Sequence, residues 1–168
     1  MDIRIRAESV ADVPAIRALT IQAFLRAPHT SHTEHLIVDH LRRAGQLSVS
    51  LVAEAAGSVI GHVGVSPVNI SDGTRDWFGL GPLSVLPQHQ RCGVGSQLVR
   101  EALRRLRERA AAGCVLLGDP AFYGRFGFRA DPALVLADVP PEYFLALPFD
   151  AAPARGSVVY HAAFAAPD

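Results

Sequence analysis

At 168 residues the chain is long enough for one domain with a substantial hydrophobic core, and we expect residues 1–168 to form a single domain because no linker or repeat divides them. Hydrophobic residues make up 49% and charged residues 19%, which is typical of globular rather than disordered proteins. Basic and acidic residues both number 16, so the zero formal net charge argues against nucleic-acid binding, which favours a basic face.

The hydropathy pattern and the cysteines predict a cytoplasmic protein. No apolar run approaches the ~20 residues that a membrane-spanning helix needs, so we expect no membrane partner. Residues 1–6 alternate polar and apolar side chains, unlike the apolar core of a signal peptide. Cys92 and Cys114 are the only cysteines, which gives neither a disulfide framework nor a metal-type spacing.

Periodicity predicts the elements of the first half of the chain. In chain order they are a strand at 3–6, a helix at 13–24, a shorter helix at 36–41, and a hairpin of strands at 47–55 and 59–70. Residues 9–12 offer capping side chains for the first helix, and Pro28 stops it. Gly45 ends the second helix and Gly57 lies in the turn of the hairpin.

The second half continues with a central strand at 76–86, a long helix at 97–111, a buried strand at 114–117, a short helix at 121–126 and a final strand at 157–164. Gly113 is expected to end the long helix. Residues 131–153 are rich in Pro and Ala and predict no regular element. This order favours an α/β fold with a mixed, mostly antiparallel central sheet flanked by helices on both faces.

The segment between the central strand and the long helix carries the clearest functional signal. It reads Gln90-Arg91-Cys92-Gly93-Val94-Gly95-Ser96. The first N–H groups of a helix have no partners inside it and lie at the positive end of its dipole. Small residues in the turn let a diphosphate come close to them. The segment therefore predicts a pyrophosphate-bearing ligand, with a tight strand-to-helix turn as the alternative.

Two familiar phosphate loops do not fit this segment. A P-loop needs Lys followed by Ser or Thr after its second glycine, whereas Ser96 follows Gly95 directly. A Rossmann fingerprint needs a third glycine and an acidic residue about 20 positions on. Position 98 is Leu, and Asp119 belongs to a Gly-Asp-Pro turn. The missing lysine and acidic metal ligands also disfavour a nucleotide hydrolase.

The pattern that fits is Gln/Arg-x-x-Gly-x-Gly/Ala after an apolar strand and Pro87, and it resembles the acetyl-CoA loop of the GNAT N-acetyltransferase superfamily. A second signature at 117–128, Leu-Gly-Asp-Pro-Ala-Phe-Tyr-Gly-Arg-Phe-Gly-Phe, is similar to the superfamily's Tyr-x-x-x-Gly-Phe segment. Its full form resembles the small bacterial YhbS-like subgroup. The resemblance extends through residues 66–68 and 156–160, so it covers most of the chain.

This resemblance implies the acyl-CoA N-acyltransferase (GNAT) fold and direct transfer of an acetyl group from acetyl-CoA, the cosubstrate, to an amine. It also implies that the central strand splays from the strand at 114–117, so that pantetheine pairs with the backbone of Leu83 and Val85. An open strand edge needs such partners. The cofactor-binding residues implied are Leu83, Ser84, Val85, Gln90, Arg91, Cys92, Gly93, Val94, Gly95, Ser96, Phe122 and Arg125.

Tyr123 matches the superfamily's tyrosine four residues before the glycine of Gly-Phe, which often donates a proton to the departing CoA thiolate. A phenol with a pKa near 10 can reprotonate a thiolate whose conjugate acid has a pKa near 8.5, given good placement. The alternative is a packed aromatic side chain beside Phe122, Phe126 and Phe128.

The base that takes the proton of the amine is less defined. Glu34 is the candidate catalytic carboxylate and His35 lies beside it, in the early helices where the superfamily's acceptor site usually forms. A solvated helix face explains both residues equally well, and water can also relay the proton. Asp76 and Asp119 are weaker candidates.

We expect no metal and no covalent intermediate. The histidines at 29, 32, 35 and 40 lack the H-E-x-x-H pattern and have no cysteine cluster beside them. Cys92 lies near helix N–H groups that would lower the pKa of its thiol. It occupies a variable position of the loop pattern, however, which favours a small filler residue over a nucleophile.

The sequence thus leaves two functions open. The first is an acetyl-CoA-dependent N-acetyltransferase with an unidentified amine acceptor, a small molecule or a protein, and a homodimer is left open. The alternative is a non-catalytic acyl-CoA-binding sensor or regulatory module. Tyr123 and the intact loop favour the enzyme. The loops at 29–35, 71–77 and 131–153 carry no pattern that identifies the acceptor.

Overall fold

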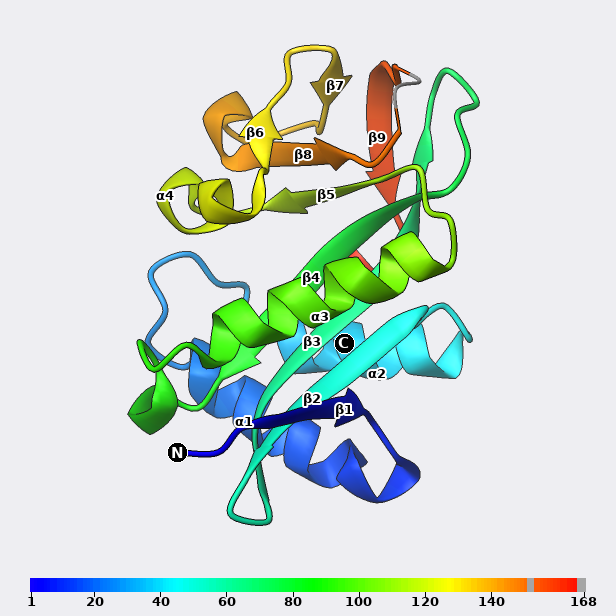
Figure 1. Ribbon diagram of the computed structural model, residues 1–168. Helices are drawn as coiled ribbons and strands as arrows, with labels where there is room; N and C mark the ends of the chain where they lie inside the picture. The colour runs from blue at the N-terminus through cyan, green and yellow to red at the C-terminus, as the bar shows by residue number, and fades with distance from the viewer. Residues whose placement is uncertain (151–152, 166–168) are drawn as a thin grey trace.

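The structure is a computed structural model that describes residues 1–150 and 153–165 (Figure 1). Its helices are α1 (Val13–Phe24), α2 (Glu34–Arg43), α3 (Val94–Glu108) and α4 (Pro120–Tyr123). Its strands are β1 (Arg4–Ala7), β2 (Val49–Ala55), β3 (Ser58–Ile70), β4 (Trp77–Val85), β5 (Gly113–Leu117), β6 (Arg129–Ala130), β7 (Leu134–Val135), β8 (Phe144–Pro148) and β9 (Gly156–Tyr160). None of the described helices is both long and apolar enough to cross a membrane.

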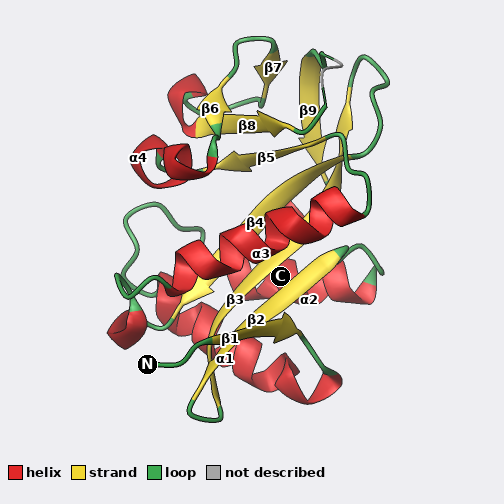
Figure 2. Cartoon of the chain, in the orientation of Figure 1, coloured by secondary structure: helices red, strands yellow, loops and turns green. Residues whose placement is uncertain are grey.

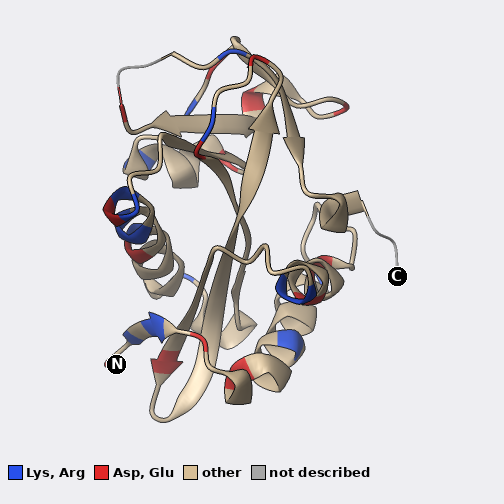
Figure 3. Cartoon of the chain, turned by 90° about the vertical axis from the view of Figure 1, so that its right-hand side faces the viewer, with Lys and Arg blue, Asp and Glu red and all other residues tan. Residues whose placement is uncertain are grey.

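The strands form a mixed, mostly antiparallel sheet, which confirms the predicted fold class. The order is β1-β2-β3-β4-β5-β8-β6, and β9 pairs with both β3 and β7. The pairs β4–β5 and β7–β9 are parallel, and the other pairs are antiparallel. Helix α3 covers one face of the sheet, and α1 and α2 cover the other (Figures 1 and 3).

Helix α3 shows why this arrangement is stable. Its apolar side chains recur at helical spacing and are buried against the sheet: Val94, Leu98, Val99, Ala102, Leu103 and Leu106. The opposite face is charged (Figure 3), and Arg104 forms ion pairs with Glu101 and Glu108. The arginines of this helix therefore form the solvated face that the sequence pattern favours.

The predicted bounds of this helix were wrong at both ends. It begins at Val94, so Gly95 and Ser96 belong to its first turn rather than to the preceding loop. It ends at Glu108, and Ala110 adopts the left-handed conformation after it. Gly113 lies in β5 instead, where an added Cβ would approach the Trp77 ring to 2.5 Å. Close packing, and not helix termination, explains that glycine.

The prediction that residues 131–153 form no regular element was also wrong. Strand β8 lies there and pairs with β5 along its whole length, from Gly113↔Pro148 to Leu117↔Phe144, and β7 is a two-residue strand. Residues 151–152 of the predicted stretch lie outside the described residues. The final strand ends at Tyr160, and residues 162–165 form a 3-10 turn rather than its continuation.

The feature that positions the site is the divergence of β4 from β5. The two strands pair only at Trp77↔Gly113, Phe78↔Cys114 and Gly79↔Val115, and then separate (Figure 2). Strand β4 stays paired with β3 as far as Val85, with an irregularity where Val63 pairs with Leu83 but Val65 pairs with Leu80. The far half of β4 therefore has a strand partner on one edge only.

Candidate active site

The N-terminus of α3 presents free backbone donors. Gly93, with φ of 85°, turns the chain into the helix, and the first intrahelical bond runs from the N–H of Gln97 to the carbonyl of Gly93. The N–H groups of the first three helical residues, 94–96, consequently have no partner within the helix. They lie at the positive end of a fifteen-residue helix, which favours an anion there.

A pocket of about 480 Å³ opens at this helix end. It is lined by Leu83, Val85, Gln90, Arg91, Gly93, Gly95, Ser96, Phe122 and Arg125. All nine are among the predicted cofactor-binding residues, drawn from three separate segments of the chain. Two arginines add positive charge to the backbone donors, and the guanidinium of Arg125 lies 4.8 Å from the centre of the Phe122 ring. We call this the phosphate pocket.

Three predicted cofactor residues do not line the phosphate pocket. The side chain of Ser84 is buried, and its backbone is in register with His62 of β3. Cys92 is exposed, and its Sγ lies 3.5 Å from the carbonyl oxygen of Gln90. The side chain of Val94 is buried in the core, so this residue offers only its N–H group.

The free edge of β4 faces this pocket. The N–H of Leu86 donates to the carbonyl of Ile60 on β3. Because backbone groups alternate in direction along a strand, those of Leu83 and Val85 point to the opposite, open side. The Nε2 of Gln90 donates to the Val85 carbonyl at 3.1 Å. The strand edge therefore offers donors and acceptors to an amide-bearing ligand.

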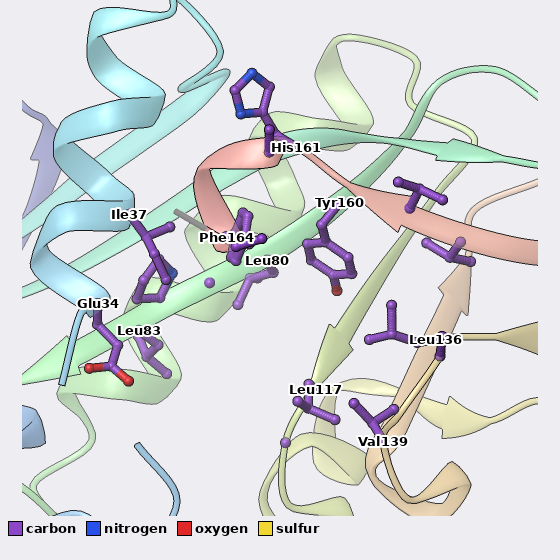
Figure 4. Close-up of a pocket in the computed structure, with 18 of the residues that line it drawn as sticks. Glu34, Ile37, Leu80, Leu83, Leu117, Leu136, Val139, Tyr160, His161 and Phe164 are labelled. Carbon is purple, nitrogen blue, oxygen red and sulfur yellow. The ribbon is translucent and has the colours of Figure 1, made fainter. Parts of the chain in front are cut away.

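A second cavity, of about 980 Å³, is bounded by the ends of α1 and α2, the bulged part of β4, the end of β5 and the C-terminal segment. Its lining is Phe24, Glu34, Ile37, Leu80, Gly81, Pro82, Leu83, Leu117, Gly118, Tyr123, Leu136, Ala137, Val139, Val158, Val159, Tyr160, His161, Ala162, Phe164 and Ala165. Figure 4 draws 18 of these residues around one space. We call it the apolar cavity. Leu83 lines both this cavity and the phosphate pocket.

Tyr123 lines the apolar cavity. Its ring packs edge-on against Phe122 and Phe128, with ring centres 4.8 and 6.0 Å away. Burial raises the pKa of Tyr123 to about 12, so the phenol is protonated at neutral pH. A Cβ at Gly118 would overlap the Tyr123 ring, so that glycine fixes where the ring lies. The packing alternative and the acid role are thus both compatible with its position.

Glu34 lies on the same cavity and His35 does not. The Glu34 carboxylate accepts hydrogen bonds from the Oγ1 of Thr30, at 2.7 Å, and from the N–H of Ser31, at 3.1 Å. These bonds hold it at the start of α2, and a carboxylate has further acceptor sites left for a ligand.

The two weaker candidates lie elsewhere. The Asp119 carboxylate caps α4 by accepting from the N–H of Ala121 at 2.9 Å. Asp76 precedes β4 at the end where β4 and β5 are paired, away from their divergence. Neither lines the apolar cavity. The structure therefore brings only Glu34 of the four candidate bases together with Tyr123.

Sequence reasoning missed Tyr160, which also lines the apolar cavity. Its ring lies over Gly79, where a Cβ would approach it to 2.5 Å. Its hydroxyl is buried with no hydrogen-bond partner among the described residues, and burial raises the pKa of Tyr160. In the sequence, the tail at 156–160 contributes to the family resemblance and carries no other signal. Nothing in its local pattern shows that its tyrosine packs on a glycine of β4.

The remaining candidates take no part in this arrangement. Cys114 is buried in β5, and burial raises the pKa of its thiol, which keeps it protonated and unreactive. Across residues 1–150 and 153–165 there is no group of three or more His, Cys, Asp or Glu residues that could hold a metal ion.

Comparisons with known proteins identify the family of the chain. A family described as acetyltransferase (GNAT) domain matches residues 46–130. The chain is 42% identical over 126 residues to the uncharacterized N-acetyltransferase YhbS of Escherichia coli K12, which covers 74% of this chain and 72% of that protein.

Two solved structures are similar over nearly the whole chain. The first is a GNAT family acetyltransferase from Brucella melitensis in complex with acetyl-CoA, with a TM-score of 0.87 and 45% identity over 97% of this chain and 98% of that one. The second is Escherichia coli YhbS in complex with CoA, with a TM-score of 0.89 and 34% identity over 98% and 92%.

Proposed function

Since the chain belongs to the GNAT acetyltransferase family, we propose that it is an acetyl-CoA-dependent N-acetyltransferase in which a primary amine of a small molecule or protein attacks the thioester directly. The observation that carries this proposal is the shared wall at Leu83. It connects a pocket suited to a pyrophosphate with a cavity that holds a protonated phenol and a carboxylate.

The cofactor follows the open edge of β4. Its pyrophosphate lies on the free N–H groups of residues 94–96, with Arg91 and Arg125 beside it. Its pantetheine amides pair with the backbone of Leu83 and Val85, where Gln90 now donates. The thioester then lies past Leu83 in the apolar cavity. We do not include Ser84 and Cys92 among the residues that bind the cofactor, because their side chains do not line the phosphate pocket.

The chemistry needs one nucleophile and one acid. The lone pair of the neutral amine forms a bond to the thioester carbon, and a tetrahedral oxyanion results that free N–H groups of β4 stabilise. The carbon–sulfur bond then breaks, and Tyr123 donates its proton to the departing sulfur. An acceptor that binds as an ammonium first loses one proton to solvent, and the proton that the amine loses on attack passes to Glu34 directly or through water. Transfer of a proton back to the Tyr123 phenolate through solvent, and release of the proton from Glu34, restore the enzyme. The products are the amide and free CoA.

We propose the cytoplasm as its location and no nucleic acid or membrane as a partner. The balance of basic and acidic residues supports the absence of a nucleic-acid role. Both cysteines are free thiols, one exposed and one buried, which suits a reducing compartment.

Calorimetry and a thiol-release assay test the proposal together. We expect heat of association with both CoA and acetyl-CoA, and amine-dependent release of free thiol from acetyl-CoA. Association without thiol release on any amine of a broad panel would favour the sensor module instead. Absence of association with either form of the carrier would overturn the proposal.

A further inference from the structure

The wall of the apolar cavity is mostly hydrocarbon. Besides backbone, its described lining is dominated by large apolar side chains: Phe24, Ile37, Leu80, Leu83, Leu117, Leu136, Val139, Val158, Val159 and Phe164. They come from α1, α2, β4, β5, β9, the segment after β7 and the 3-10 turn at 162–165. Such a wall favours the binding of an apolar ligand, because removing apolar ligand surface from water lowers the free energy of the complex.

Two of these side chains are unusually exposed for their size. Leu117 is 51% and Val159 is 59% exposed, and both residues line the cavity from different strands. Large exposed apolar side chains that gather at one hollow mark a binding site. The sheet does not need them there, since β5 and β9 would pair equally well with polar residues at exposed positions.

The charge on the cavity wall is minimal. Glu34 is the single carboxylate on the lining that the structure describes, and no arginine lies on it. The Nδ1 of His161 accepts a hydrogen bond from the N–H of Ala163 at 3.0 Å. Figure 4 shows Glu34 at one end of the set of side chains and Leu136 and Val139 at the other.

We infer that the acceptor is a hydrophobic monoamine: one amino group, which meets Glu34 as an ammonium, on an alkyl or arylalkyl body that fills the apolar cavity. This inference rests on the proposed function and specifies its acceptor. A second cationic group would be desolvated against hydrocarbon without a partner, which is costly. Polyamines, aminoglycosides and anionic amino compounds are therefore poor acceptors.

The sharpest test compares two acceptors of equal length, pentylamine and 1,4-diaminobutane, in the thiol-release assay with acetyl-CoA. We expect kcat/KM to be at least about 100-fold higher for pentylamine. Along the series from propylamine to hexylamine, kcat/KM rises about fourfold for each added methylene, because each buried methylene contributes a constant transfer free energy. Equal rates for the matched pair would overturn the inference.

Variants of the cavity wall test whether the dependence of kcat/KM on chain length arises in the apolar cavity. Leu117→Ser and Val159→Ser each lower kcat/KM for hexylamine about five- to tenfold and change it little for propylamine, because a shorter chain reaches less of the wall. The matched control is Val135→Ser. Val135 is 52% exposed but does not line the cavity, so this variant keeps the activity of the unmodified protein on both amines. A control that falls together with the two variants would contradict the assignment.

The outcomes separate this inference from the proposed function. Turnover of 1,4-diaminobutane or of peptide amines in preference to alkylamines keeps the enzyme and overturns the inference. If no amine is turned over, thermal unfolding of the CoA complex decides. A rise in Tm with hexylamine but not with 1,4-diaminobutane would support a cavity that binds hydrophobic monoamines, although the proposed catalytic function would have failed. No rise in Tm with either amine would overturn both the proposed function and the inference about the acceptor.

Discussion

The phosphate pocket and the apolar cavity share a wall but are built in opposite ways. The phosphate pocket uses backbone N–H groups and small residues from one turn, with Gly93 and Gly95 at fixed spacing. The apolar cavity uses side chains from α1, α2, β4, β5, β9 and their connections. A site built from the backbone strictly limits the residue types at a few adjacent positions. A cavity built from side chains limits the residue types at many distant positions only loosely.

Gly95→Leu is expected to have the largest effect, because it fills the backbone-built site directly. A Cβ at this position lies at ordinary contact distances, 3.6 to 3.9 Å, from Phe122, Leu83 and Val85, and the larger leucine side chain competes with the ligand for the pocket that Gly95 lines. Displacing the diphosphate from two N–H donors costs at least about 100-fold in acetyl-CoA affinity, measured by calorimetry. The matched control is Gln97→Leu, two positions on and exposed. An unchanged affinity in Gly95→Leu would mean that the diphosphate lies elsewhere.

Tyr123→Phe tests the junction of the two sites. Removing the hydroxyl keeps the ring contacts, so we expect kcat to fall about 100-fold while the affinity for acetyl-CoA changes less than twofold. Steady-state kinetics and calorimetry give the two quantities. Tyr143→Phe is the control, since Tyr143 is exposed and lines neither site. Full activity of Tyr123→Phe would leave the residue a packing role only.

Glu34→Gln tests the polar end of the apolar cavity. We expect kcat/KM for the amine to fall about tenfold, with unchanged KM for acetyl-CoA, because the variant loses the charge that attracts the ammonium and takes its proton. His35→Gln, one residue further along α2 but off the cavity, keeps its activity. The opposite ranking of the two variants would move the base to His35.

Gly118→Ala tests the positioning of Tyr123. Its Cβ would overlap the tyrosine ring, so we expect kcat to fall about fivefold. In the Tyr123→Phe background the same change has little further effect on kcat, because the proton donor is already absent. Gly124→Ala is the control, since a Cβ there meets nothing within 4 Å. Additive effects of the two changes would show that Gly118 acts independently of Tyr123.

The smallest change is expected in the dependence of kcat on pH, because we expect no loss of kcat at high pH. Burial raises the pKa of Tyr123 to about 12, so its hydroxyl stays mostly protonated at pH 10, where an unperturbed tyrosine would be half ionised. With an acceptor whose amino group is already neutral at pH 8.5, we expect kcat to stay constant from pH 8.5 to 10. A pH–rate profile that halves by pH 10 in the Tyr123 protein, but not in Tyr123→Phe, would contradict this protonation state.

The parts of the fold that follow from local periodicity were predictable. The hairpin of β2 and β3 turns where Ala56 and Gly57 adopt positive φ, and α3 repeats its apolar residues at helical spacing. Strand β8 was missed because its run Phe144–Pro148 is short, contains proline and follows a Pro-rich stretch. Its conformation is set by pairing with β5, which is a distant partner in the sequence.

The phosphate pocket and the apolar cavity also differ in how far local sequence patterns predict them. The glycine spacing predicts a pyrophosphate-bearing ligand, and the family resemblance of residues 90–96 and 117–128 implies acetyl-CoA and makes Tyr123 the candidate acid. Tyr160, Leu117 and Val159 give no such signal, because an apolar or aromatic residue in a strand is typical of any core. Their place on the lining of the apolar cavity follows only from the three-dimensional arrangement, in which β4 and β5 diverge and β9 lies across β3.

The divergence of β4 from β5 also has a consequence for the free protein. Three residue pairs join them, and in the proposed binding mode a pantetheine arm would supply main-chain hydrogen bonds to β4 beyond Gly79. Binding of the cofactor would then connect the two halves of the molecule as an extra strand does. We therefore expect the amide protons of Leu83 and Val85 to exchange quickly with deuterated solvent in the free protein and slowly in the complex, with no change in the bounds of any helix or strand.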